Sequence, residues 1–197
     1  MGLSDLPRHL TRRAFPRFSA WNRQRKAEVV ARFVGERQIR SVLFVGVGEG
    51  WVARELLVER AAAAGAERVA CLDLHLRTNA PWPYVRGSGL ALPFPDQSFD
   101  LVLSNAVIEH VGDIAEQEEL LREQRRVGRH WIVTTPNRWF PVESHTGAVL
   151  QHWSPAWRAR QDRFTRLLSR GEFRALLPPG TSVAGSSLGP TFLATSA

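Results

Sequence analysis

The chain has 197 residues, of which 44% are hydrophobic, so its length and composition suit one folded domain with one sizeable core. It contains no apolar run near the roughly 18 residues that a membrane-spanning helix needs, and its N-terminus lacks the apolar segment of a signal peptide. We therefore expect no membrane span and a cytoplasmic location. The single cysteine, Cys71, allows no internal disulfide and reads as a small buried core residue.

The formal net charge is +7, and Lys26 is the sole lysine among 26 basic residues. A basic balance is compatible with nucleic acid or an anionic membrane surface, and equally with solvated helix faces in an arginine-biased sequence. The arginines gather in the N-terminal arm and in residues 158–174, without the interleaved aromatics and glycines of a single-strand binder. A nucleic-acid partner is therefore open but not favoured.

The first 40 residues read as an arm followed by a helix. We expect residues 1–18 to form a loosely ordered basic arm, because Pro7 and Pro16 interrupt any long helix. Ser19 is then the N-cap of a helix over residues 19–36, whose apolar residues recur at helical spacing. This helix would pack beside a sheet.

Residues 41–50 carry the first chemical signal. An apolar run over 41–45 predicts a buried strand, and Gly46, Gly48 and Gly50 then allow the backbone to approach a ligand closely. Trp51 replaces the third glycine of a dinucleotide fingerprint, and Glu49 would repel a pyrophosphate. The turn therefore favours a cationic nucleoside without phosphates, which describes S-adenosylmethionine. A glycine-rich turn without a ligand is the alternative.

A helix from about residue 51 to Gly65 leads to a second strand over 68–73 that ends in Asp73. An acidic residue here, some 20 residues after the glycine turn, is placed to accept hydrogen bonds from ribose hydroxyls, although it is also compatible with a turn or cap. Prolines make the next crossover short and irregular, before a brief third strand over 84–86 and a turn over 87–90.

The middle of the chain continues the alternation of strands and helices. A tight connector over 92–100 precedes a fourth strand over 101–104, and Asp113 with Glu116 forms a capping-box pattern for a helix to about Arg126. A fifth strand covers residues 129–134. This alternation predicts a parallel sheet with right-handed crossovers.

The last third differs in character. Residues 135–146 read as a long polar and aromatic loop, and residues 155–170 as an arginine-rich amphipathic helix. Ser169 with Glu172 predicts the cap of a further short helix, and residues 181–187 and 190–195 predict two closing antiparallel strands. We expect one α/β Rossmann-like, doubly wound domain over 1–197, with helices on both faces of a mainly parallel sheet and an antiparallel C-terminal strand. Its cofactor-binding core is 41–135, its acceptor-side segment 136–177 and its closing strands 181–195.

Three blocks in this order resemble class I S-adenosylmethionine-dependent methyltransferases, of the type 11-like small-molecule kind. They are the strand and glycine turn over 42–50, Asp73, and the segment from Gly89 to Asn105 followed by Glu109 and His110. The third block is far more specific than the glycine turn. The resemblance is strong over about residues 41–136 and loose elsewhere.

The resemblance implies a role for each matching position. The turn from Gly46 through Val47, Gly48 and Glu49 to Gly50 would hold the methionine part of the cofactor. The nucleoside would be held by the ribose-binding Asp73, by Leu74 packing on the adenine, by Ser88 and Gly89 at the adenine edge, and by Leu90 covering the ring. Asn105 and Ala106 would form the floor beneath the methionyl group.

Two positions depart from the family pattern. Family members usually carry an acidic residue at the position of Phe44, which helps to organise the methionine ammonium, and often an aspartate at the position of Ser88. The serine hydroxyl accepts a hydrogen bond more weakly than a carboxylate does. Both departures bear on cofactor affinity and not on the fold.

The resemblance implies transfer of a methyl group to an unidentified small-molecule acceptor, without a metal. Candidate general bases are His110, whose alternative role is structural, and His145 with Glu143 nearby. Trp139, Phe140 and Trp153 form either an acceptor pocket or core beneath the loop. The rival hypotheses are a catalytically silent binding or partner domain, motivated by the two departures, and a nucleic-acid methyltransferase, motivated by the charge. The oligomeric state is open, a homodimer included.

Overall fold

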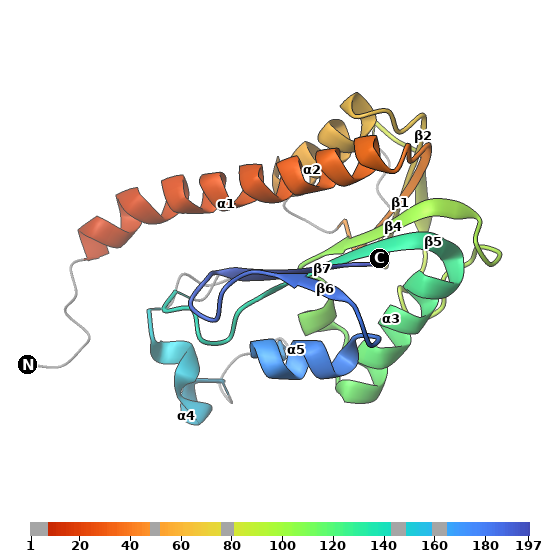
Figure 1. Cartoon of the computed structure of the whole chain (residues 1–197). Helices are drawn as coiled ribbons and strands as arrows, with labels where there is room; N and C mark the ends of the chain where they lie inside the picture. The colour runs from red at the N-terminus through yellow and green to blue at the C-terminus, as the bar shows by residue number, and fades with distance from the viewer. Residues whose placement is uncertain (1–7, 48–51, 76–80, 143–148, 159–164) are drawn as a thin grey trace, which may run out of the picture.

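The computed structural model describes residues 8–47, 52–75, 81–142, 149–158 and 165–197 (Figure 1). Within these ranges, seven strands form one sheet and helices cover both of its faces. The helices are α1 (Arg8–Glu36), α2 (Val52–Ala63), α3 (Ile114–Val127), α4 (Pro155–Arg158) and α5 (Arg170–Leu176), with 3-10 turns η2 (Ile108–His110) and η3 (Gln151–Trp153). The strands are β1 (Ser41–Val45), β2 (Arg68–Asp73), β3 (Tyr84–Arg86), β4 (Phe99–Asn105), β5 (Gly128–Pro136), β6 (Ser182–Ala184) and β7 (Thr191–Thr195).

The sheet has the strand order β3-β2-β1-β4-β5-β7-β6. Strands β1 to β5 run parallel, whereas β7 pairs antiparallel with both β5 and β6. The prediction of a doubly wound, mainly parallel sheet with an antiparallel C-terminal strand is therefore confirmed. Because the order reverses between β1 and β4, the carboxyl ends of these strands form the crevice where such sheets bind ligands.

Strand β1 is buried on both faces and divides the core into two layers. Val42 and Phe44 face the layer of α1 and α2, whereas Leu43 and Val45 face the layer of α3 and α5. Figure 1 shows α1 and α2 along one side of the sheet and α3 and α5 along the other. Cys71, on β2, is fully buried as expected, and burial raises the pKa of its thiol to about 12.

Helix α1 begins earlier than the sequence predicts. It starts at Arg8 and passes through Pro16, so the prediction of a loosely ordered arm over 1–18 is wrong from residue 8 onward. Ser19 lies inside the helix, where its hydroxyl accepts a hydrogen bond from Arg23, and is not the N-cap. A proline removes one amide donor, and here the helix continues on both sides of it. Contacts just after it hold the helix, since Phe18 stacks on Phe140 with ring centroids 5.3 Å apart.

The arginine-rich segment is also not one helix to residue 170. Helix α4 ends at Arg158 among the described residues, and residues 165–169 are not helical. Leu168 instead bridges Asn137 and is fully buried beneath the sheet. Ser169 has extended backbone angles and caps α5 in a capping box with Glu172, as predicted, and an extended cap residue cannot continue a preceding helix. Among the described residues, no helix has the length and hydropathy needed to cross a bilayer.

Candidate functional site

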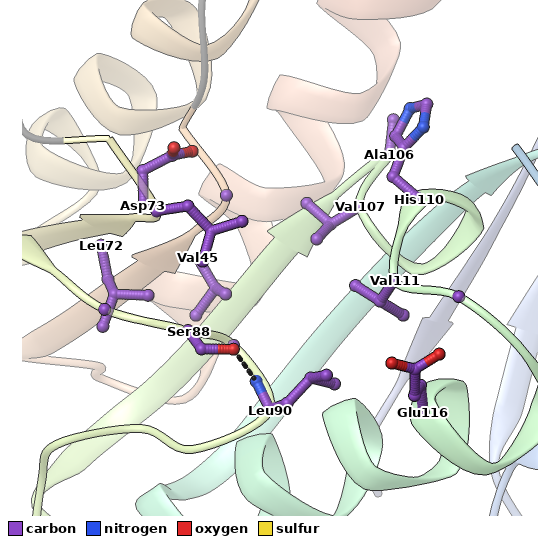
Figure 2. Close-up of a pocket in the computed structure, with 15 residues that line it drawn as sticks. Val45, Leu72, Asp73, Ser88, Leu90, Ala106, Val107, His110, Val111 and Glu116 are labelled. Carbon is purple, nitrogen blue, oxygen red and sulfur yellow. Dashed lines mark hydrogen bonds between the residues drawn. The ribbon is translucent and has the colours of Figure 1, made fainter. Parts of the chain in front are cut away.

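A cavity of about 440 Å³ opens at the carboxyl ends of β1, β2 and β4. Its size falls within the range of about 300–1,000 Å³ that is usual for small-molecule sites. Figure 2 shows Asp73 and Glu116 on opposite sides of it, with Val45 and Leu90 between them. Its walls are formed by Val45, Gly46, Leu72, Asp73, Leu74, Gly87, Ser88, Gly89, Leu90, Ala106, Val107, His110, Val111, Gly112 and Glu116.

Most of the described residues that the sequence singled out meet in this cavity. Those in its wall are Gly46, Asp73, Leu74, Ser88, Gly89, Leu90, Ala106 and His110. Val47 and Asn105 lie outside the wall, Val47 in the core layer of α1 and α2. Gly48, Glu49, Gly50, Glu143 and His145 lie outside the described residues.

Gly46 makes the turn that ends β1. Its φ of 73° lies in the left-handed region, and its amide donates to the carbonyl of Leu72, 2.8 Å away. A Cβ here would lie 2.4 Å from Cγ2 of Val107, on the turn after β4. Both the conformation and the close approach require glycine.

Asp73 ends β2 and presents its carboxylate at the cavity. Its Oδ1 accepts a hydrogen bond from the backbone N–H of His75, 3.1 Å away. The next side chain, Leu74, is 60% exposed at the rim of the cavity. A carboxylate beside an exposed aliphatic side chain matches a ligand that presents hydroxyls and an apolar ring.

The turn after β3 forms the opposite wall. Ser88 Oγ accepts a hydrogen bond from the backbone N–H of Leu90, 3.1 Å away, which fixes this turn (Figure 2). A Cβ on Gly89 would lie 2.8 Å from Cδ1 of Leu120 and 3.1 Å from Cγ1 of Val45. Gly89 therefore lets the turn lie directly against β1 and α3.

A carboxylate on α3 anchors the segment that follows this turn. Glu123 is 4% exposed, accepts a hydrogen bond from the backbone N–H of Leu92 at 2.8 Å, and pairs with Arg126 at 2.7 Å. The guanidinium of Arg126 also donates to the carbonyls of Leu92 and Phe94. The hydrogen bond from Arg126 holds the pKa of Glu123 below its ordinary value. Together with the bond from the Leu92 amide, it outweighs burial, which raises the pKa. No local motif in the sequence marks this anchor, because it joins residues 31 apart in sequence.

The end of β4 is tied to β5 and to α1. Asn105 Oδ1 accepts hydrogen bonds from Thr134 Oγ1 at 2.8 Å and from Lys26 Nζ at 2.7 Å. Ala106 then adopts a φ of 55°, uncommon for a residue with a Cβ, and its amide donates to the Thr134 carbonyl. The chain thus turns sharply at the cavity wall, where left-handed residues are often functional.

Comparison with known proteins shows which proteins this chain is similar to. A family model described as a methyltransferase domain matches residues 43–130. A probable S-adenosylmethionine-dependent methyltransferase of Mycolicibacterium smegmatis is 34% identical over 116 residues, which are 58% of this chain and 45% of that protein. A second from Mycobacterium tuberculosis is 38% identical over 109 residues, 50% of this chain and 36% of that protein. The chain thus spans less than half the length of these relatives.

The fold has matching solved structures. The magnesium protoporphyrin IX methyltransferase of Synechocystis, solved with bound S-adenosylhomocysteine, superposes with a TM-score of 0.54 at 12% identity, covering 87% of this chain and 81% of that one. Over residues 43–130 the chain is therefore similar to S-adenosylmethionine-dependent methyltransferases, and the solved structures match in fold. S-adenosylmethionine is the cofactor of this family.

The residues around the cavity are compatible with the adenosine end of that cofactor. The apolar walls from Leu72, Leu90 and Val111 suit a purine, and the carboxylate of Asp73 suits a ribose diol. Glu116, at the start of α3, adds a second carboxylate to the wall. The sequence marks Glu116 only as part of a capping box, which it forms with Asp113. No motif indicates that Glu116 also lies in the cavity wall.

Of the two histidines proposed as general bases, the structure describes only His110. His110 lies in the cavity wall, is exposed, and places Nδ1 3.3 Å from Oγ1 of Thr165. His145, with Glu143, lies outside the described residues. Beside His110, Glu109 is fully buried and contacts Thr135 Oγ1 at 3.3 Å, while its backbone carbonyl accepts from the Arg166 amide at 2.7 Å. These bonds fix the turn that carries His110.

The two tryptophans that follow β5, Trp139 and Trp153, are exposed. Trp139 is 51% exposed and Trp153 37% exposed, and their ring centroids lie 6.2 Å apart. Phe140, which follows Trp139, stacks on Phe18 of α1. The indole N–H of Trp153 donates to the carbonyl of Arg138 at 3.0 Å. Trp139 and Trp153 are therefore surface residues on the strand-end side of the sheet and are not core beneath the loop.

Proposed function

We propose that this chain transfers the methyl group of S-adenosylmethionine to a small-molecule acceptor. The observation that carries the proposal is the cavity at the carboxyl ends of β1, β2 and β4, where the carboxylate of Asp73 meets the exposed side chain of Leu74. Asp73 accepts hydrogen bonds from the ribose hydroxyls, and Leu74 and Leu90 pack against the two sides of the adenine. Ser88 and Glu116 supply the polar groups that face the edge of the adenine ring.

When bound, the cofactor supplies a methyl group on a positively charged sulfur. The protein's task is then to hold the acceptor lone pair in line with that bond, and positioning of this kind contributes on the order of 7–11 kcal/mol. The acceptor enters from the side of Trp139 and Trp153, which follow β5 and expose apolar surface. This placement favours an acceptor with an apolar or aromatic part.

His110 is the general base of this proposal. It is exposed in the cavity wall, and its contact with Oγ1 of Thr165 orients the ring. A positioned base adds about 100-fold to 10,000-fold when the acceptor must lose a proton, and nothing when the acceptor is already an anion. A screen of phenols, carboxylic acids and amines with methyl-labelled cofactor identifies the acceptor class. The His110→Gln variant should then transfer the methyl group more slowly than wild type only to acceptors that must lose a proton in the reaction.

Calorimetry with S-adenosylhomocysteine tests the cofactor site directly. The Asp73→Ala variant should bind at least about tenfold more weakly, as expected for losing charge-assisted hydrogen bonds worth about 1.5–3 kcal/mol. Glu67→Gln is the matched control, because Glu67 is an exposed carboxylate that precedes β2, at the opposite edge of the sheet. It should leave the affinity unchanged.

Three outcomes separate the proposal from its rivals. Absence of measurable binding by the wild-type chain at millimolar cofactor would overturn it. Binding without methyl transfer to any acceptor in the screen would favour a silent binding domain. Methyl incorporation into RNA or DNA, with binding that weakens steeply as salt rises, would favour a nucleic-acid substrate.

A further inference from the structure

Glu116 places a second carboxylate in the cavity wall, across the cavity from Asp73 (Figure 2). It belongs to the first turn of α3. Leu120, one turn further along α3, packs against the turn after β3, since a Cβ on Gly89 would lie 2.8 Å from its Cδ1. Residues four apart lie on the same face of a helix. Glu116 is therefore on the face of α3 that is turned towards residues 88–90.

The capping box of α3 holds the side chain of Glu116 in position. Its Oε2 accepts a hydrogen bond from the backbone N–H of Asp113 at 3.0 Å, and its own backbone N–H donates to Oδ1 of Asp113 at 3.2 Å. A carboxylate has about four lone-pair sites, and this cap uses one of them. Glu116 can therefore accept a hydrogen bond from a ligand while it still caps the helix.

Ser88, the other polar group at this end of the cavity, has a different chemistry. Its Oγ accepts a hydrogen bond from the backbone N–H of Leu90 at 3.1 Å, and its hydroxyl has a hydrogen to donate. A hydroxyl can serve a donor or an acceptor on the ligand, whereas a carboxylate accepts hydrogen bonds and donates none. Glu116 therefore distinguishes an amino group from an oxo group, and Ser88 does not.

We propose that Glu116 selects the base of the cofactor by accepting a hydrogen bond from the exocyclic amino group of adenine. The inference rests on the proposed function and deepens it, because the base reaches Glu116 only when Asp73 holds the ribose at the other side of the cavity. A purine with an oxo group at this position would turn an oxygen towards the carboxylate, and two acceptors would face each other. Glu116 is thus a specificity residue for 6-aminopurines.

A purely structural role for Glu116 makes a different prediction. If its carboxylate served only to cap α3, a change at this position would affect every ligand of the cavity to a similar degree. If the carboxylate meets the amino group, the change affects ligands according to the group they carry there. Two ligands that differ only in this group separate the cases.

The test compares S-adenosylhomocysteine with S-inosylhomocysteine, which has a 6-oxo group in place of the 6-amino group, by calorimetry on the full chain. The wild-type chain should bind the adenosyl compound at least about tenfold more tightly, as expected for a hydrogen bond to a charged group. Glu116→Gln keeps the cap, because glutamine also completes a capping box, and its amide can donate to the oxo group. In this variant the two affinities should lie within about twofold of each other.

Two further variants serve as controls. Glu118→Gln removes an exposed carboxylate from the same helix, outside the cavity wall, and should leave the ratio of the two affinities unchanged. Asp73→Ala should weaken both ligands to a similar degree, since both carry the same ribose. It should therefore also keep the ratio.

The two proposals fail in distinguishable ways. Equal affinity of the wild-type chain for the two ligands, or the same ratio in Glu116→Gln as in wild type, would overturn the role of Glu116 while leaving the cofactor site intact. If the wild-type chain binds neither ligand, the proposed function fails first and takes this inference with it. Binding of S-inosylhomocysteine by Glu116→Gln at least as tight as by wild type also shows that the variant is folded.

Discussion

Oε2 of Glu123 accepts a hydrogen bond from the backbone N–H of Leu92, 2.8 Å away, so a carboxylate on α3 holds the segment that follows the cavity wall. Arg126 completes the anchor by pairing with Glu123 and donating to the carbonyls of Leu92 and Phe94. The turn with Ser88 and Gly89 is therefore positioned from α3. This wall of the cavity depends on a contact between residues 31 apart in sequence.

Replacing Glu123 with Gln should destabilise the protein. The substitution removes the charge that Arg126 faces, and breaking a buried pair from one side costs about 3–5 kcal/mol. We expect the lower end, about 3 kcal/mol, because the Arg126 side chain is 27% exposed. Urea unfolding measures this change. Glu119→Gln is the control: Glu119 pairs with the exposed Arg122 on the same helix, and its loss should cost less than about 1 kcal/mol. Equal losses in the two variants would contradict the anchor.

The same carboxylate should make stability depend on acid pH. The pKa of Glu123 is lower in the folded state than its ordinary value, because the hydrogen bond from Arg126 outweighs burial. Its contribution is therefore complete above the ordinary pKa of about 4.3 and is lost as the pH falls through the folded value. Urea unfolding between about pH 7 and about pH 3 should show the difference between wild type and Glu123→Gln shrinking towards acid. A difference independent of pH would argue against an ionised Glu123.

Gly89 should not tolerate a side chain. A Cβ there would lie 2.8 Å from Cδ1 of Leu120 and 3.1 Å from Cγ1 of Val45, so Gly89→Ala displaces the turn or its neighbours at a cost of about 1–3 kcal/mol. Gly171→Ala is the control, since nothing lies within 4 Å of a Cβ at Gly171 in α5. That variant should be neutral or stabilising by up to about 1 kcal/mol. Thermal unfolding and cofactor titration of both variants provide the comparison.

Restoring an acidic residue at position 44 should harm the protein rather than improve it. Phe44 is 3% exposed in the core layer of α1 and α2, where a carboxylate would be buried among apolar side chains. Phe44→Asp should cost more than the about 3–5 kcal/mol of truncating a buried Phe to Ala, whereas Phe44→Leu should cost far less. Urea unfolding ranks these variants. A stable Phe44→Asp protein with tighter cofactor binding would show that this position faces the ligand.

The features that the sequence predicted correctly are local ones. The apolar run of β1, the glycine after it and the capping boxes at Asp113 and Ser169 all act within a few residues, so their spacing identifies them. The parallel pairing of β1 to β5 follows from the alternation of strands and helices. Asp73 could be placed at the cavity because the end of a parallel strand defines the edge of the sheet.

The features that the sequence did not predict depend on distant parts of the chain. Lys26 stood out only as the sole lysine, and its pairing with Asn105 exists because α1 packs across the sheet. The start of α1 was misplaced because a local rule about Pro16 was applied without the contact between Phe18 and Phe140 beyond it. Residues 165–169 were predicted as part of an arginine-rich helix over 155–170. The bridge between Leu168 and Asn137, which replaces that helix, joins distant residues and leaves no local signal in the sequence.

Both outer strands of the sheet, β3 (Tyr84–Arg86) and β6 (Ser182–Ala184), are three residues long. A second copy that added itself to either border would gain only a few backbone hydrogen bonds, and at β3 it would meet the exposed charge of Arg86. Strand-to-strand joining is therefore a weak route to self-association for this fold. If the chain dimerises, we therefore expect side-chain contacts to carry more of the interface than strand pairing, and single substitutions should then weaken it.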